Sequence, residues 1–78
     1  MPMIFTLSGK QINLTKELVE KAVEKTTPES IRKYRVRIGN RDFPIKQAVS
    51  LASGVSIAAF ISTDAYRILT RLGFEVME

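Results

Sequence analysis

The sequence contains neither cysteine nor histidine. Without cysteine there is no disulfide framework and no thiolate metal site, and a reducing cytoplasm is the default compartment. Without histidine, a common zinc ligand and the commonest general base are both missing. The few isolated acidic residues show no metal-ligand spacing, and the serines have no histidine partner. We therefore expect no enzyme activity, no metal and no cofactor.

Long apolar segments are absent as well. No apolar run approaches the ~18 residues of a membrane-spanning helix, and the N-terminus lacks the sections of a secretory signal. A hydrophobic content of 45% and a charged content of 26% are ordinary for a globular domain. We expect one cytoplasmic domain, residues 1–78, without membrane contact. Its small core favours a homodimer or a larger protein partner.

The net charge of +4 is concentrated in one segment. Residues 32–46 carry six basic residues and one acidic residue, whereas residues 1–31 are neutral and residues 47–78 carry a charge of −1. Such localisation indicates a polyanionic partner such as nucleic acid. The alternative is a solvated edge strand whose basic residues discourage aggregation. The sequence leaves both interpretations open.

The basic segment has the pattern of a β-hairpin that runs into a helix. Gly39-Asn40 supplies a two-residue turn, because glycine accepts the positive φ that such turns need. Counting outward pairs Ile38 with Arg41, Arg37 with Asp42 and Val36 with Phe43, which separates apolar from charged side chains. The apolar face consists of Tyr34, Val36, Ile38, Phe43 and Ile45, and the opposite face consists of Arg35, Arg37 and Asp42, with Lys33 and Lys46 at its ends.

The rest of the chain predicts an α+β fold: a small antiparallel sheet of three to four strands, containing the central hairpin and packed on one face by three helices. The other sheet face would be left to solvent or a ligand. Strands are expected at Met3–Leu7, at Lys10–Asn13 after a Ser8-Gly9 turn, and at Phe74–Met77; helices are expected from about 15 to 26 after an Asn13 or Thr15 cap, from Pro44 to Gly54, and from a Ser62 or Thr63 cap to Gly73.

The sequence leaves three structures open for Val55–Ile61: a short helix capped by Ser56, a strand, or a buried connection. Residues 51–60 also have the small-residue pattern of a helix-turn-helix, with a second helix from about Ser56. Ser53 and Thr63 fit that motif poorly, because both positions are usually apolar. The second predicted helix would bury Ile45, Ala48, Val49 and Ala52 and turn Lys46, Gln47 and Ser50 outward.

Candidate nucleic-acid contacts lie on and beside the hairpin. Arg35 and Arg37 point the same way about 7 Å apart, close to the phosphate spacing along one strand, and a two-stranded ribbon fits a DNA major groove. Lys46 either completes an anion site at a helix start or lays its stem over Phe43 or Tyr34. The predicted nucleic-acid-binding residues are Arg32, Lys33, Arg35, Arg37, Arg41, Lys46, Arg67 and Arg71.

Two further side-chain roles are open. Tyr34 and Tyr66 could stack on a base or present a hydroxyl, although a core position is favoured for Tyr34, which shares the apolar face of the hairpin. Asp42 is expected to pair across the strands with Arg37 or Arg41.

From Tyr34 onward the sequence has a hairpin with a glycine-containing turn, an aromatic residue, a lysine that opens a helix, then a glycine, a phenylalanine and a closing Leu-Gly-Phe-x-Val run. The residues of this pattern are Tyr34, Val36, Gly39, Phe43, Lys46, Ala48, Gly54, Phe60, Leu69, Leu72, Gly73, Phe74 and Val76. In these residues the sequence resembles the small N-terminal head domain of HNH-type, modification-dependent restriction endonucleases. The resemblance implies a DNA-binding accessory role, with sensing of modified DNA as one form of it, and the nuclease part is absent because HNH chemistry needs histidine. Phe43 stands where those relatives carry tyrosine.

The sequence therefore predicts a non-catalytic nucleic-acid-binding module, with duplex DNA as the favoured partner. The alternative is a protein-interaction or dimerisation module that uses the edge strand of the hairpin.

Overall fold

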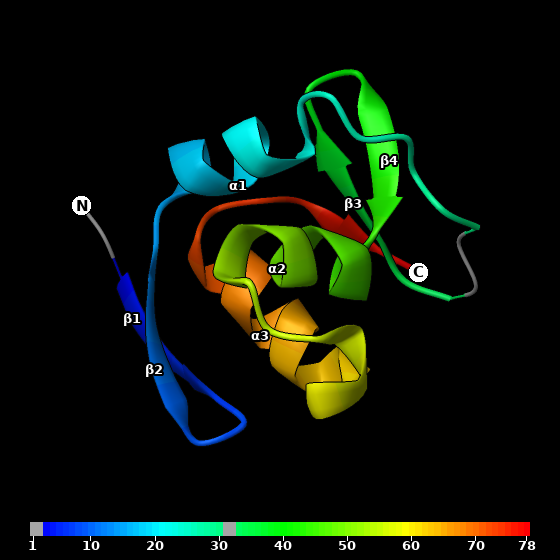
Figure 1. The fold of residues 1–78 in the computed structure, drawn as a ribbon. Coiled ribbons are helices and arrows are strands. Elements are labelled where there is room, and N and C mark those ends of the chain that lie inside the picture. The colour runs from blue at the N-terminus through cyan, green and yellow to red at the C-terminus, as the bar shows by residue number, and fades with distance from the viewer. Residues whose placement is uncertain (1–2, 31–32) are drawn as a thin grey trace.

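The computed structural model describes residues 3–30 and 33–78, and it confirms the predicted α+β class. Figure 1 shows the helices between the two-stranded sheet near the N-terminus on one side and the hairpin on the other. In chain order the elements are β1 (Met3–Leu7), β2 (Lys10–Leu14), α1 (Lys16–Val23), β3 (Arg35–Ile38), β4 (Arg41–Pro44), α2 (Ile45–Ser53), the 3₁₀ helix η1 (Ile57–Ala59), α3 (Ser62–Arg71) and β5 (Val76–Met77).

The predicted hairpin register is confirmed. Strand β3 pairs antiparallel with β4, with Val36 opposite Phe43 and Ile38 opposite Arg41. Gly39 takes φ +63° in the turn, a conformation that glycine adopts without steric cost. Val36 and Phe43 are fully buried, so the apolar face of the hairpin lies on the core as its alternation predicts.

The strands form two sheets rather than one. Strand β5 pairs with the free edge of β3, giving the order β4-β3-β5, while β1 and β2 pair only with each other in the described chain. The two sheets stay apart because β2 leads directly into α1, with one residue between them, and because α2 contacts β2, β3 and β4. Helix α2 thus fills the space in which the β1–β2 sheet and the hairpin would have to pair to form one sheet.

Helix α2 is the centre of the core. It contacts α1 and α3 as well as the strands, and Ala48 and Val49 on it are completely buried. The helix begins directly after Pro44, which is both the last residue of β4 and the N-cap residue of α2. It ends at Gly54, whose φ of +76° is the left-handed conformation of a glycine cap, as the sequence predicts.

The other helix ends confirm one predicted cap and correct two other expectations: α1 ends at Val23 rather than near residue 26, and α3 has a different N-cap residue. Thr15 caps α1 by accepting a hydrogen bond from the Leu18 N–H at 3.0 Å. At α3 the expected Ser62 or Thr63 cap is wrong: Ile61 is the N-cap residue, and the Asp64 carboxylate accepts its N–H at 3.3 Å. Because Asp64 reaches back over the first turn, the helix starts at Ser62.

The helix-turn-helix interpretation is wrong. After Gly54 the chain forms only the three-residue η1, which Ser56 caps through the Ala58 N–H, and Phe60 is then extended. A recognition helix needs a continuous helix at this position, whereas the chain here turns the Phe60 side chain into the core. In the part of the chain that the structure describes, no helix has the length and apolarity to cross a membrane.

Gln47 is buried, although its position on α2 predicts an outward side chain. Its Oε1 accepts the Glu29 N–H at 2.9 Å, and its Nε2 donates to the Thr27 carbonyl at 3.2 Å. The side chain therefore ties the connection between α1 and β3 to the start of α2. The sequence could not reveal this, because the partners are backbone groups 18 and 20 residues away.

We expect Gln47→Met to lower the free energy of unfolding by about 1–3 kcal/mol, because it leaves two part-buried backbone groups without partners. Chemical denaturation followed by circular dichroism measures the change. The matched control is Gln11→Met, at an exposed position on β2, which should stay within about 0.5 kcal/mol. Equal stability of the two variants would show that the hydrogen bonds of Gln47 to the backbone do not stabilise the fold.

Candidate nucleic-acid interface

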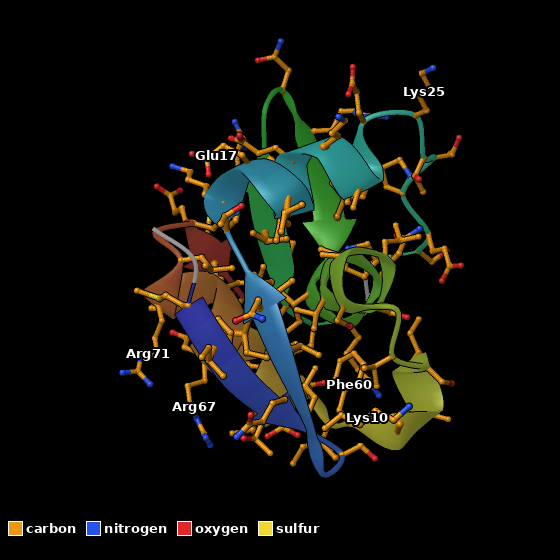
Figure 2. The ribbon with its side chains drawn as sticks, turned by 60° about the vertical axis from the view of Figure 1, so that its left-hand side comes forward. Lys10, Glu17, Lys25, Phe60, Arg67 and Arg71 are labelled. Carbon is orange, nitrogen blue, oxygen red and sulfur yellow. The ribbon has the colours of Figure 1, made fainter. Side chains whose placement is uncertain are left out.

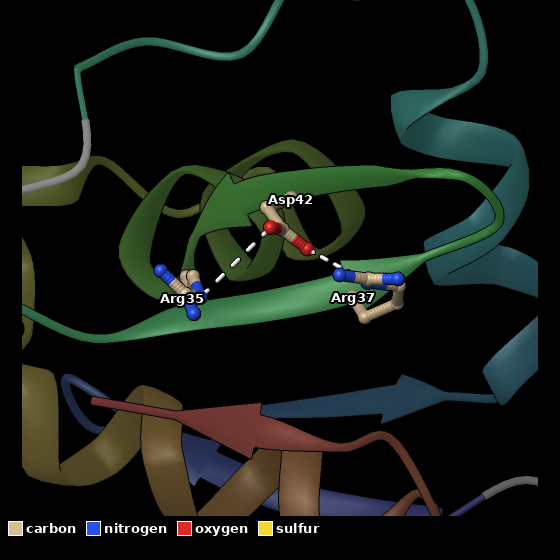
Figure 3. Close-up of polar contacts among 3 residues, drawn as sticks. All are labelled: Arg35, Arg37 and Asp42. Atoms are coloured by element: carbon tan, nitrogen blue, oxygen red, sulfur yellow. Dashed lines mark hydrogen bonds and ion pairs between the residues drawn. The ribbon is translucent and has the colours of Figure 1, made fainter.

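Two of the predicted arginines share one carboxylate on the outer face of the hairpin. Arg37 Nε lies 2.9 Å from Asp42 Oδ1, and Arg35 Nε lies 3.8 Å from Asp42 Oδ2 (Figure 3). The pairing of Asp42 with Arg37 is one of the two predicted options. Both arginine side chains are about half exposed, at 43% and 56%, so these ion pairs add little to stability.

A second acid lies on the same outer face. The register of β3 with β5 puts Arg35 opposite Met77, and the Arg37 N–H donates to the Glu75 carbonyl at 3.2 Å. Residues opposite each other in a sheet share a face, so Glu75 joins Arg37 there. The formal charges of the two arginines and the two acids sum to zero, so the outer sheet face is far less cationic than the hairpin sequence alone predicts.

Arg41 points away from that face and binds the end of α1. Its Nη1 donates to the Thr26 carbonyl at 2.8 Å, and its Nη2 donates to the carbonyls of Val23 and Glu24 at 3.0 and 2.9 Å. The last carbonyls of a helix have no partner within the helix, and a cation there is also favoured by the helix dipole. Arg41 thus joins the hairpin to α1, and three of its five guanidinium N–H groups donate to these carbonyls.

Lys33 and Lys46 meet at a groove beside the hairpin. The groove has a volume of about 700 Å³, and both lysines line it together with Tyr34 and Gln47. The Lys46 ammonium lies 5.6 Å from the centre of the Phe60 ring, rather than over Phe43 or Tyr34. The complete lining is Glu29, Ser30, Lys33, Tyr34, Pro44, Ile45, Lys46, Gln47, Ile57, Ser62 and Thr63.

The electrostatics of this groove favour an anion. Neither Lys33 nor Lys46 forms an ion pair within residues 3–30 and 33–78, although Glu29 lies along the same groove. Helix α2 has no acidic residue in its first turn and no side-chain cap, whereas α1 has Glu17 and α3 has Asp64. Lys46 therefore lies at the positive end of a helix dipole. The two positive charges repel each other, and a bound anion would stabilise both.

The groove continues into a smaller recess of about 190 Å³, lined by Tyr34, Ser62, Thr63 and Tyr66. The two tyrosine rings meet edge to face, with centroids 5.6 Å apart and planes at 72°. Tyr34 packs partly into the core, as predicted, and Tyr66 is 43% exposed. Sequence reasoning missed Ser62 and Thr63 as groove residues, because their residue types marked them only as candidate caps of α3.

Arg67 and Arg71 lie elsewhere. They point outward on the side of α3 near β1 (Figure 2) and line a separate recess of about 250 Å³ with Asp64 and Ile4. Helix α3 therefore presents Ser62, Thr63 and Tyr66 to the groove and its arginines to another side. Of the eight predicted residues, the structure brings Lys33 and Lys46 together at the groove. Arg35 and Arg37 lie on the outer sheet face, and Arg32 is outside the described residues.

Comparison with known proteins adds one family. No curated protein and no solved structure matched the chain. The pattern of the SCO5918-like family matches residues 6–78, which include every described element except the start of β1. Because this match covers nearly all of the sequence, the chain belongs to the SCO5918-like family.

Proposed function

We propose that this protein is a non-catalytic nucleic-acid-binding module that holds the phosphate backbone in the groove between the hairpin and the starts of α2 and α3. The observation that carries the proposal is the convergence of Lys33 and Lys46 on a groove of about 700 Å³ at a helix start without an acidic residue. Phosphate contacts supply most of the affinity of nucleic-acid-binding proteins.

Arg35 is a third candidate phosphate contact, on the outer sheet face beside the groove rather than among its lining residues. It lies opposite Pro44 in the β3–β4 register, and Pro44 lines the groove. Its distance of 3.8 Å from Asp42 exceeds hydrogen-bond length, and within the described chain its buried Nε has no hydrogen-bond partner. Asp42 therefore neutralises Arg35 less than Arg37, and the exposed end of the Arg35 side chain is the better phosphate contact.

The dependence of affinity on salt tests the proposal. Three phosphate contacts, through Lys33, Arg35 and Lys46, predict a slope of about −2 to −3 in a plot of log K against log salt concentration, since each contact contributes about −0.7 to −0.9. Fluorescence anisotropy with labelled single-stranded and duplex probes between low and physiological salt measures this slope. A flat plot, or no binding of any probe, would refute the proposed function.

The alternative function, strand addition at the hairpin edge, has less support. The edge strand β4 has only four residues and ends at Pro44, which lacks the N–H that a partner strand would need. A dimer that persists at high salt in a protein that shifts no nucleic-acid probe would favour this alternative. Sedimentation at two salt concentrations, run beside the anisotropy experiment, separates the two functions.

A further inference from the structure

We infer that the groove takes single-stranded nucleic acid, with an unpaired base against Tyr66 and the flanking phosphates at Lys33 and Lys46. This inference rests on the proposed function and names its substrate class. It departs from the duplex partner that the hairpin sequence favours, because Asp42 pairs with the hairpin arginines and the β3–β5 register puts Glu75 beside Arg37 on the outer sheet face.

The first argument is the shape of the site. The main groove and the smaller recess share Tyr34, Ser62 and Thr63 as lining residues, so they form one continuous concave surface. The volume of the main groove, about 700 Å³, lies in the range of sites that bind small-molecule-sized groups, and the recess adds about 190 Å³. A duplex keeps its bases stacked inside and offers only its outer edges and backbone. A single strand can turn an unpaired base into such a recess.

The second argument is the tyrosine pair. In the edge-to-face arrangement one ring points its edge at the other, so the pair does not cover both faces of both rings. Tyr34 is the less available of the two, because the Lys33 ammonium lies 5.2 Å from its ring centre and the ring packs on the core. Tyr66 is 43% exposed, and it provides the open aromatic surface on which a base stacks.

The third argument is the order of chemical groups along the surface. Cationic Lys33 and Lys46 line the larger part, the hydroxyl residues Ser62 and Thr63 lie at the junction, and Tyr66 lines the far end. A nucleotide has the same sequence of properties: a charged phosphate, a polar sugar and an aromatic base. Proteins that bind single strands without sequence preference combine a positively charged groove with aromatic stacking surfaces in this way.

The experiment compares affinities for a labelled dT oligonucleotide, an rU oligonucleotide and a DNA duplex of equal length at low salt. We expect at least one single strand to bind about tenfold more tightly than the duplex. Tyr66→Ala should weaken single-strand binding roughly tenfold, the effect of one lost base stack, and should leave duplex binding within twofold. Tyr66→Phe keeps the ring and should keep the affinity. A difference between dT and rU reports contact with the sugar 2′-hydroxyl.

The control is Leu18→Ala, which removes an equally exposed side chain from α1, outside the groove. Thermal unfolding of each variant shows whether the fold is retained, and Tyr66→Phe keeps the test valid if Tyr66→Ala loses stability. Salt-dependent binding in which the duplex equals or exceeds both single strands would overturn the inference and leave the proposed function standing. Single-strand preference that Tyr66→Ala does not change would overturn the role of Tyr66. Absence of salt-dependent binding would overturn both proposals.

Discussion

Reversing the charges of both groove lysines, with Lys33→Glu and Lys46→Glu, is expected to weaken nucleic-acid binding about 100-fold at low salt. Each substitution removes one attraction and adds one repulsion, and charges about 4 Å apart at a protein surface interact by roughly 1–4 kcal/mol. Solvent screening keeps each of these four changes at about 0.7 kcal/mol, as for exposed ion pairs, and a combined loss of about 3 kcal/mol corresponds to about two orders of magnitude in affinity. Fluorescence anisotropy on the wild-type protein and the double variant measures the loss.

The fold should survive this change. Lys46→Glu places an acid in the first turn of α2, where the helix dipole favours negative charge, and this offsets the lost contact of the ammonium with the Phe60 ring. The control is Lys10→Glu with Lys25→Glu, which changes the net charge equally at two exposed positions that do not line the groove. If the control loses as much affinity as the groove variant, binding depends on net charge alone and the groove is not its site.

Replacing Arg41 by methionine is expected to lower the free energy of unfolding by about 2 kcal/mol and the melting temperature by roughly 10 °C. The reason is the loss of three hydrogen bonds from a charged donor to carbonyls at the end of α1. Such bonds are worth about 1.5–3 kcal/mol each when buried, and we reduce their sum because two of the three are exposed. For a chain of this size, total stability is on the order of 4–12 kcal/mol.

Arg37→Met is the matched control for Arg41→Met. Arg37 neighbours the same turn, but its side chain is 56% exposed and pairs only with Asp42, so its loss should cost less than about 0.5 kcal/mol. Thermal and chemical denaturation compare the stabilities, and anisotropy compares the affinities of the folded proteins. Arg41→Met should bind within twofold of wild type under conditions in which it is folded. Full stability together with lost binding would instead make Arg41 a phosphate contact, as its sequence position suggests.

The elements that were predicted well depend on short-range rules. The Gly39-Asn40 turn and the alternation around Val36 determine the hairpin register, because a shift of one residue would move every apolar side chain to the outer face. The end of α2 follows from Gly54, and its start follows from Pro44. Each of these signals lies within a few residues of the structure that it specifies.

The parts that could not be predicted depend on groups far apart in the chain. Arg41 appears as one more cation in a basic segment until α1 is seen to end beside it, about 17 residues away. Gln47 appears solvent-exposed until the connection before β3 lies over it. The groove forms where Tyr34, just before β3, lies near Lys46 on α2 and Ser62 on α3. No spacing in the sequence predicts that these three residues line one surface. Local chemistry predicts the types of the candidate binding residues, and tertiary packing decides which of them are available.

The shared role of Pro44 has a consequence for the entropy of binding. Because this residue ends β4 and caps α2, no loop separates the sheet from the helix that carries Lys46. The backbone at Lys46 is therefore already fixed relative to Arg35, and an incoming strand has to immobilise only side-chain rotamers there, at about 0.5–1.5 kcal/mol for each long side chain. This half of the groove is preorganised for the ligand that we propose.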